Sequence, residues 1–326
     1  MLNIRSHTLD ATLFFNQDAS IMNMQEKPKR QILRAQSAGF CWGVERAIDI
    51  ARDIALNKQK PVFTDGPLIH NKHMVTQLEA EGVHELGDYQ SKSELHIDED
   101  AKEDAVMVVR AHGISPERRK YLKSLDLKFK DATCPDVGII AGKIKLHSRK
   151  GYHTVIFGDP QHPEVIGLMG YTEDRGHVVQ TTEDVQSLPA MGDKVCMVSQ
   201  STMFTHEFKK LAACLAESHP EAVVIDTICN ATKERQGDVI KLKAEGCEAI
   251  VVIGGSHSAN TMKLAKLAEA QNLPTFHVES AKDLDLAAIS RYNPIGVTAG
   301  ASTPEFLIDE VCKKLEALPI EEPVLA

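Results

Sequence analysis

Asp131-Ala132-Thr133-Cys134-Pro135 joins a strand-like run to a helical stretch and places a cysteine at the junction. Cys41 lies 93 residues earlier, after Ala38-Gly39-Phe40, and Cys229 lies 95 residues later, after Asp226-Thr227-Ile228. The near-equal spacing and the shared local context predict three similar α/β units around a pseudo-threefold axis, each contributing one thiolate. Chance spacing among seven cysteines is the alternative, and the shared strand-to-helix position argues against it.

Around these junctions, from about Lys29 onward, short β-rich runs alternate with amphipathic helical stretches, which predicts βα units and mostly parallel sheets. A stripe at helical spacing marks one buried helix face: Val44, Ala47, Ile48, Ala51, Ile54 and Ala55. The strand candidates are 105–111, 154–158, 194–199, 222–228, 249–254 and 294–298, and the helix candidates are 43–57, 136–150, 205–218, 232–245, 260–272 and 304–318. We expect a poorly ordered extension over 1–29, units over 30–134, 135–228 and 229–318, and a tail over 319–326.

Composition limits the functional classes. The 326 residues suit two or three α/β units, and 43% hydrophobic with 25% charged residues is typical of soluble globular proteins. A formal charge of −9 argues against non-specific nucleic-acid binding. No apolar run approaches the ~18 residues of a membrane-spanning helix. An odd number of cysteines without an export signal favours a reducing compartment, so we expect a cytoplasmic protein.

The cysteine pattern also limits which metal group the protein can bind. Structural zinc usually binds close Cys-x-x-Cys pairs, and the sequence has none. Three thiolates can hold a four-iron cluster and leave one iron without a protein ligand, free to bind substrate. A helix N-terminus is expected to lower the pKa of each thiol. The other four cysteines are interpreted as small core residues: Cys196, Cys214, Cys247 and Cys312.

Polar residues follow several predicted strands. In the segment 158–164, His162 and Glu164 flank a proline and form a candidate proton-transfer pair, with a solvated loop as the alternative. The Gly-rich turns 251–260 and 300–304 each lead into a helix and offer N–H donors to phosphate oxygens.

At the second of these turns, Pro304 suits the first helical position with Ser302 or Thr303 as the cap, and plain capping is the alternative there. His70 and His112 lie at similar junctions. They are either structural histidines or further donors to a diphosphate.

In combination these motifs resemble the 4-hydroxy-3-methylbut-2-enyl diphosphate reductases of the non-mevalonate isoprenoid route. The resemblance runs from about Gln31 to Leu318. It rests on Gly39-Phe40-Cys41-Trp42-Gly43-Val44, Ala111-His112-Gly113, Asp131-Ala132-Thr133-Cys134-Pro135, His162-Pro163-Glu164-Val165 and Gly296-Val297-Thr298-Ala299-Gly300-Ala301-Ser302.

The resemblance implies three α/β units in a trefoil around one 4Fe-4S cluster held by Cys41, Cys134 and Cys229. It also implies catalytic roles for Glu164, His162 and Ser201, and a substrate site made of His70, His112, His162, Ser201, Ser258, Ala259, Asn260 and Ser302. The implied reaction removes an allylic hydroxyl with two electrons and two protons and yields isopentenyl and dimethylallyl diphosphates. Ferredoxin or flavodoxin is the implied electron donor.

The sequence departs from the family's pattern at two positions. Ala259 replaces the middle serine of a Ser-Ser-Asn motif, which removes a hydroxyl and leaves a backbone N–H. Ser201 stands where the family has threonine, so the hydroxyl is kept on a side chain that rotates more freely. Two other functions are weighed against the reductase: a non-redox cluster hydro-lyase, which needs no reductant, and a cluster-sensing module, which needs no proton donor.

Overall fold

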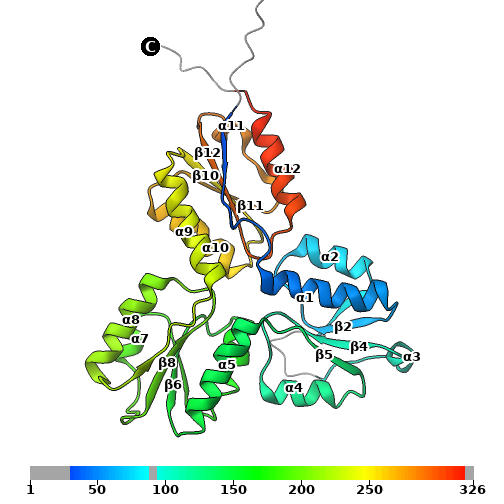
Figure 1. Cartoon of the computed structure of the whole chain (residues 1–326), viewed down its shortest axis with the longest axis vertical. Coiled ribbons are helices and arrows are strands. Elements are labelled where there is room, and N and C mark those ends of the chain that lie inside the picture. The colour runs from blue at the N-terminus through cyan, green and yellow to red at the C-terminus, as the bar shows by residue number, and fades with distance from the viewer. Residues whose placement is uncertain (1–29, 88–93, 320–326) are drawn as a thin grey trace, which may run out of the picture.

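The protein consists of three lobes around a common centre, as the computed structural model shows for residues 30–87 and 94–319 (Figure 1). The predicted extension over 1–29 and residues 320–326 of the predicted tail lie outside the described residues. Each lobe contains one four-stranded parallel sheet between helices, so the predicted α/β fold with three similar units is confirmed. Within the described residues, no helix has the length and apolar character that crossing a membrane requires.

The first sheet has the strand order β3-β2-β4-β5. Its strands are β2 (Val62–Asp65), β3 (Val83–Leu86), β4 (Val106–Val109) and β5 (Lys128–Asp131). Helices α1 (Trp42–Arg52) and α2 (Lys72–Ala80) cover one face, and α3 (Glu99–Lys102) and α4 (Pro116–Lys123) accompany the other. A π-helical turn, Asp53–Asn57, continues α1.

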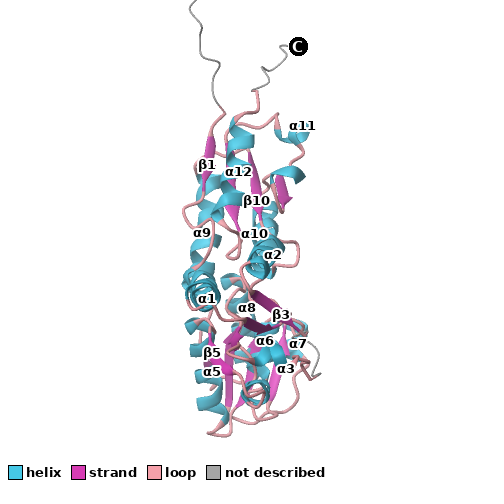
Figure 2. Cartoon of the chain, turned by 90° about the vertical axis from the view of Figure 1, so that its right-hand side faces the viewer, coloured by secondary structure: helices cyan, strands magenta, loops and turns pink. Residues whose placement is uncertain are grey.

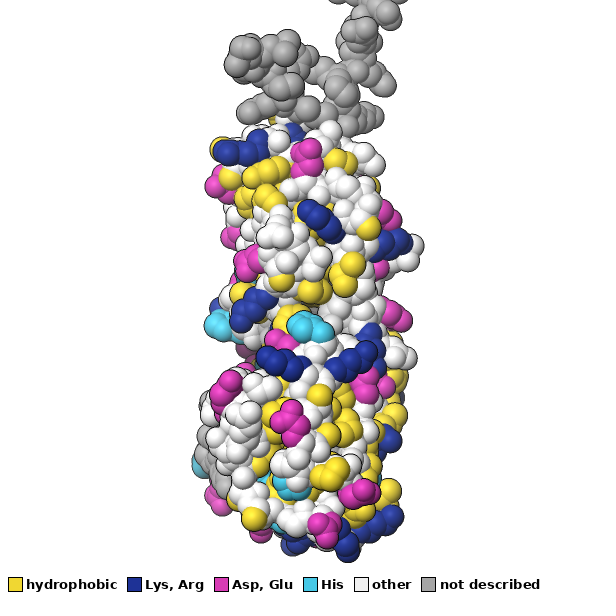
Figure 3. All heavy atoms as spheres, turned by 90° about the vertical axis from the view of Figure 1, so that its left-hand side faces the viewer, with side chains coloured by type: hydrophobic (Ala, Val, Ile, Leu, Met, Phe, Trp, Pro, Cys, Tyr) yellow, Lys and Arg dark blue, Asp and Glu magenta, His cyan; other side chains and the backbone are white. Residues whose placement is uncertain are grey.

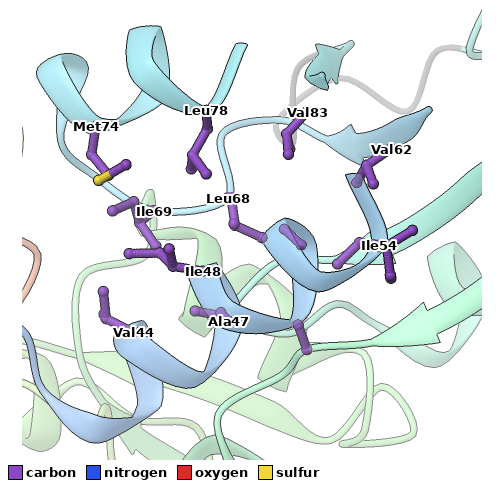
Figure 4. Packing of buried hydrophobic residues seen from close by; sticks show 14 of the residues in the cluster. Val44, Ala47, Ile48, Ile54, Val62, Leu68, Ile69, Met74, Leu78 and Val83 are labelled. Carbon is purple, nitrogen blue, oxygen red and sulfur yellow. The ribbon is translucent and has the colours of Figure 1, made fainter. Parts of the chain in front are cut away.

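The predicted stripe on α1 is part of this lobe's core. Ala47 and Ile48 pack against Ile69 and the α2 residues Met74 and Leu78, as Figure 4 shows. All five of these side chains are 2% exposed or less. Full burial of a side chain such as leucine or isoleucine contributes about 1.5–3 kcal/mol, which fixes α1 firmly on its sheet.

The second sheet has the corresponding order β7-β6-β8-β9. Its strands are β6 (His153–Phe157), β7 (Gly176–Val179), β8 (Val195–Ser199) and β9 (Val223–Val224). Helices α5 (Pro135–Ser148) and α6 (Pro163–Met169) cover one face, and α7 (Thr182–Gln186) and α8 (Thr205–Ser218) cover the other. The predicted strand 222–228 is therefore shortened. The Thr227 hydroxyl donates to the Ser199 carbonyl and accepts from the Ser199 N–H, which replaces strand pairing there.

The third sheet, β1-β12-β10-β11, takes a strand from each end of the chain. Its strands are β1 (Ile32–Arg34), β10 (Ala249–Ile253), β11 (Thr275–Val278) and β12 (Ile295–Ala299). Helices α9 (Asn230–Ala244) and α10 (Ala259–Ala270) cover one face; α11 (Leu286–Ile289), α12 (Glu305–Glu316) and the 3-10 turn Ala281–Asp283 accompany the other.

The pairing of β1 corrects the predicted boundary of the first unit. β1 lies within the predicted segment 30–134 but pairs in parallel with β12, so it belongs to the third sheet. Read in the opposite direction, the third sheet has the order β11-β10-β12-β1. β1 therefore occupies the fourth position, as β5 and β9 do in their sheets. In all three lobes the chain leaves the fourth strand, passes a cysteine and enters the helix that packs on the next sheet. The cysteines therefore lie where one lobe connects to another, at the centre of the trefoil.

Candidate active site

Each of the three cysteines is the N-cap of a helix: Cys41 of α1, Cys134 of α5 and Cys229 of α9. Their backbone N–H groups donate to three equivalent carbonyls at 2.9–3.0 Å. Cys41 donates to Ala301 just after β12, Cys134 to Ala111 just after β4, and Cys229 to Ser201 just after β8. The N-terminal ends of α1, α5 and α9 meet at the centre of Figure 1. All three thiols are half-buried, form no disulfide and line one cavity.

Close packing around Cys134 depends on a glycine. A β-carbon added to Gly43 in α1 would lie 2.5 Å from the Cys134 sulfur, well inside van der Waals contact. The missing side chain therefore lets the first turn of α1 approach the thiol of α5. This contact explains why a glycine stands two residues after Cys41.

Gly43→Ala is expected to displace α1 from Cys134. Overpacking of this kind costs about 1–3 kcal/mol, and here the added methyl group meets a thiol of the central trio. We expect lower iron and sulfide content per chain after anaerobic purification. Gly237→Ala in α9, where an added β-carbon meets nothing within 4 Å, is the matched control. Equal iron content in both variants would contradict the packing argument.

Burial governs the protonation of the thiols. It raises the pKa of Cys134 to about 11, although backbone N–H groups of Asp136 and Val137 act in the opposite direction. Burial also raises the pKa of Cys229. The expected lowering of the thiol pKa by helix N-termini is therefore wrong for these two, because desolvation outweighs the N–H groups. Without a metal both thiols are protonated at neutral pH, and a bound cation would displace the protons.

Three histidines from two lobes form a second cluster beside the cysteines. His70 follows β2, His112 follows β4 and His162 is the N-cap of α6. Their ring centroids lie 4.4–5.7 Å apart, and one nitrogen of each lies within 4.8 Å of the others. Burial lowers the pKa of His70 to about 4 and that of His162 to about 3, with nearby positive charges adding to the effect. Neutral imidazoles can donate to an anion or ligate a divalent cation.

The Nδ1 atoms of two of these rings differ in their hydrogen bonding. His162 Nδ1 accepts from the backbone N–H of Glu164 at 3.2 Å, so in the neutral ring the proton is on Nε2. Burial also holds the pKa of His112 well below its usual value, and its buried Nδ1 has no hydrogen-bond partner. Both rings therefore keep one nitrogen for a ligand.

Glu164 is buried in the first turn of α6, with 2% of its surface exposed. Its two carboxylate oxygens accept from the backbone N–H and the hydroxyl of Ser201, both at 2.7 Å. Burial raises the pKa of Glu164, and the two bonds from Ser201 partly oppose that rise. The alternative of a solvated loop is wrong for the end of the segment 158–164, because α6 begins at Pro163 and Glu164 is buried. This helix fixes the carboxyl group against Ser201.

The remaining predicted donors lie at the start of α10 and after β12. Ser258 is the N-cap of α10, Ala259 and Asn260 begin the helix, and all three line the cysteine cavity together with Ser302. The side-chain nitrogen of Asn260 is buried without a hydrogen-bond partner, which leaves it available to a ligand. Near Ser302 the predicted capping is wrong, because Pro304 itself is the N-cap of α12 and the Thr303 hydroxyl donates to Ile253.

The sequence motifs did not point to the cations near the site, among them the buried Arg235 and the half-buried Lys263. Arg235 of α9 is 3% exposed and donates to the carbonyls of Gly39 and Ala231, next to Cys41 and Cys229. Lys263 of α10 lies within electrostatic range of Glu164 and His162. Both stand among ordinary charged helix residues, so no motif or spacing could have identified them.

The predicted site residues thus come together from all three lobes around one cavity. Cysteines cap α1, α5 and α9, and polar donors come before or at the start of α2, α6 and α10. Figure 2 shows the cysteine-capped helices along one side of the molecule and the second set displaced toward the other side. This arrangement defines a class: a three-lobed α/β protein with a central thiol trio beside a polar pocket.

The chain belongs to the LytB protein family, whose sequence profile matches residues 32–316. It is 62% identical over 289 residues to the 4-hydroxy-3-methylbut-2-enyl diphosphate reductase of Opitutus terrae, covering 88% of this chain and 100% of that protein. The reductase of the same name from Alkaliphilus oremlandii is 36% identical over 290 residues, with 88% and 100% covered.

Solved structures agree with this assignment. The E-1-hydroxy-2-methyl-but-2-enyl-4-diphosphate reductase of Plasmodium falciparum superposes with a TM-score of 0.81 at 28% identity and covers 90% of each chain. A structure of (E)-4-hydroxy-3-methyl-but-2-enyl diphosphate reductase, described as the terminal enzyme of the non-mevalonate pathway, gives a TM-score of 0.63 at 36% identity and covers 88% of this chain and 99% of that one.

Proposed function

We propose that this protein is a 4-hydroxy-3-methylbut-2-enyl diphosphate reductase. The reaction breaks the allylic C–O bond, forms a C–H bond and releases water, and it consumes two electrons and two protons. Its products are isopentenyl and dimethylallyl diphosphates. The proposal is supported by the 62% identity to a named reductase over that protein's whole length. The observation that carries it is the meeting of three cysteine N-caps and the Glu164–Ser201 pair in one cavity.

We propose further that Cys41, Cys134 and Cys229 hold one 4Fe-4S cluster. The donor set fits such a group, because three free thiols converge from three helix N-termini. The buried guanidinium of Arg235 would offset the negative charge of the bound thiolates. When bound, the cluster would supply electrons and one iron without a cysteine ligand as a Lewis acid.

The diphosphate would bind at the polar end of the cavity. The Asn260 amide and the imidazoles of His112 and His162 each have a nitrogen for a phosphate oxygen. His70, Ser258 and Ser302 border the same space. Hydrogen bonds to a charged group contribute about 1.5–3 kcal/mol each, so a few of them would anchor the substrate despite the net charge of −9. Anchoring at this end would position the substrate's hydroxyl near the thiol trio.

Glu164 would supply the proton that lets the hydroxyl leave as water. Its raised pKa keeps a carboxylic acid protonated closer to neutral pH than an exposed glutamate. Ser201 would hold the carboxyl group in place through its backbone N–H and hydroxyl. His162 would donate from Nε2, since its Nδ1 accepts from Glu164.

Because the reaction consumes two electrons, an external reductant is needed, and ferredoxin or flavodoxin is the proposed source. Anaerobically purified protein should contain about four iron and four sulfide per chain. It should convert the hydroxylated diphosphate only when a reductant is present. Turnover without any reductant would instead indicate a hydro-lyase, and a spectral change on substrate binding without product would indicate a sensor.

Ala259→Ser is expected to tighten substrate binding. The added hydroxyl would lie at the first position of α10, between Ser258 and Asn260. A neutral hydrogen bond contributes about 0.5–1.5 kcal/mol, so KM should fall about two- to tenfold with kcat nearly unchanged. Ala270→Ser, at the exposed far end of the same helix, is the control and should leave KM unchanged. An unaltered KM in Ala259→Ser would show that this position does not face the diphosphate.

A further inference from the structure

Helix α5, which begins after Cys134, differs in charge from the other two cysteine-capped helices. Residues 137–153 contain four Lys or Arg residues and no Asp or Glu, in a chain whose net charge is −9. The four cations are Lys143, Lys145, Arg149 and Lys150. By contrast, Glu45 and Asp49 are exposed on α1, and acidic residues alternate with lysines along α9. The basic surface is thus confined to one of three otherwise equivalent helices.

The same helix exposes apolar side chains and two glycines near its charged residues. Ile139 is 56% exposed and Leu146 is 53% exposed, and they lie two turns apart on one helix face. Beside them, β-carbons added to Gly138 and Gly142 would meet nothing within 4 Å. An apolar centre with a charged rim is the usual composition of a protein docking surface. On the face drawn in Figure 3, by comparison, acidic and basic side chains are intermixed.

A groove beside α5 leads from this surface toward the thiol trio. Arg46, Gly142 and Lys145 line the groove, and so do Cys134, His112 and Glu164, which also line the active-site cavity. Arg46 donates to the carbonyl of Thr133, the residue before Cys134. A molecule seated on α5 would therefore lie next to Cys134, one of the three cysteines that would hold the cluster.

We propose that this surface, Gly138, Ile139, Gly142, Lys145, Leu146 and Arg149, docks a small acidic one-electron carrier protein. The proposal rests on the proposed function, which consumes two electrons per turnover. Opposite charges would steer the carrier to α5 although the whole chain is negative, because screening confines each charge's field to roughly 8–10 Å. The carrier would approach on the side of α1, α5 and α9, while the helices α2, α6 and α10, which begin beside several of the substrate donors, lie toward the other side (Figure 2).

The test compares two reductants on the cluster-loaded enzyme: an acidic plant-type ferredoxin, and methyl viologen, which needs no docking surface. In Lys145→Glu/Arg149→Glu, the KM for ferredoxin should rise at least about tenfold, because charge reversal turns attraction into repulsion. Turnover with methyl viologen should stay within about twofold of the unaltered enzyme. Lys241→Glu is the matched control, since Lys241 lies 12 residues after Cys229 and Lys145 lies 11 after Cys134.

Ferredoxin-supported turnover of the unaltered enzyme should also fall as salt is raised from 50 to 300 mM, and the double variant should lose most of that dependence. An unchanged ferredoxin KM in the double variant, or an equal rise in Lys241→Glu, would overturn the docking surface while leaving the reductase intact. No turnover of the unaltered enzyme with either reductant would overturn the proposed function and the docking proposal with it.

Discussion

Glu164→Gln is expected to lower kcat by about 100-fold or more, because a positioned general acid contributes about 10²–10⁴. Glutamine keeps the shape of the side chain and an oxygen that accepts from Ser201, but it carries no proton that it can transfer. The cluster and substrate affinity should remain, since the Glu164 carboxyl group bonds to Ser201 and the backbone N–H that donates to His162 is unaltered. Single-turnover rates measure the catalytic step, iron content measures the cluster, and substrate titration measures the affinity.

The pH profile gives a second readout for Glu164. Because burial raises the pKa of this carboxyl group, its protonated form persists at higher pH than that of an exposed glutamate. We expect kcat to fall as pH rises through that raised pKa, and the fall should disappear in Glu164→Gln. Glu217→Gln, at an exposed position of α8, is the control and should keep both rate and profile. Near-normal kcat in Glu164→Gln with the same pH profile would rule out the proton-donor role.

Replacing any one of Cys41, Cys134 or Cys229 by serine is expected to remove most of the bound iron and the brown colour. Altering a group that only hydrogen-bonds to a metal ligand already lowers metal affinity about 10–100-fold. Loss of a ligand itself should therefore leave roughly a tenth of the iron or less. Serine is close in size to cysteine, and its hydroxyl stays protonated at neutral pH. The measurements are iron and sulfide per chain and the visible absorption spectrum under anaerobic conditions.

Cys214→Ser is the matched control for this series. Cys214 is also half-buried, but it lies on α8, where its sulfur is 3.8 Å from the carbonyl of Thr182. The Cys214→Ser variant should keep full iron content and activity. Full iron retention in one of the three N-cap variants would remove that cysteine from the proposed ligand set, and equal loss in all four variants would reject the choice of ligands.

The three-lobed fold could be predicted because its repeating unit is local. Each cysteine follows a strand and begins a helix, so spacing and context carried the information. The partner of β1 could not be predicted in this way. Ile32 pairs with Ile295, and a contact between such distant segments leaves no periodic signal in either. The predicted first unit, 30–134, therefore included the residues of β1, which complete the third sheet.

The candidate site was predictable to the extent that its residues follow strands in recognisable motifs. The structure adds the physical quantities that depend on burial. Helix N-termini alone suggested a lowered thiol pKa, whereas desolvation raises the pKa of Cys134 to about 11. Arg235 illustrates the same limit, because only packing between α9 and the loop at Gly39 distinguishes it from a surface arginine.

The position of β1 also constrains when the protein can mature in the cell. During synthesis β1 leaves the ribosome before the strands of the first two sheets, but its partner β12 follows only after both of those sheets. The first two sheets use contiguous segments and can form while the chain is still growing. Cys41, which follows β1, gains its final position only after the last lobe has closed. A complete three-thiol centre therefore forms only once β12 has been made and has paired with β1, so metal insertion there should follow formation of the third sheet.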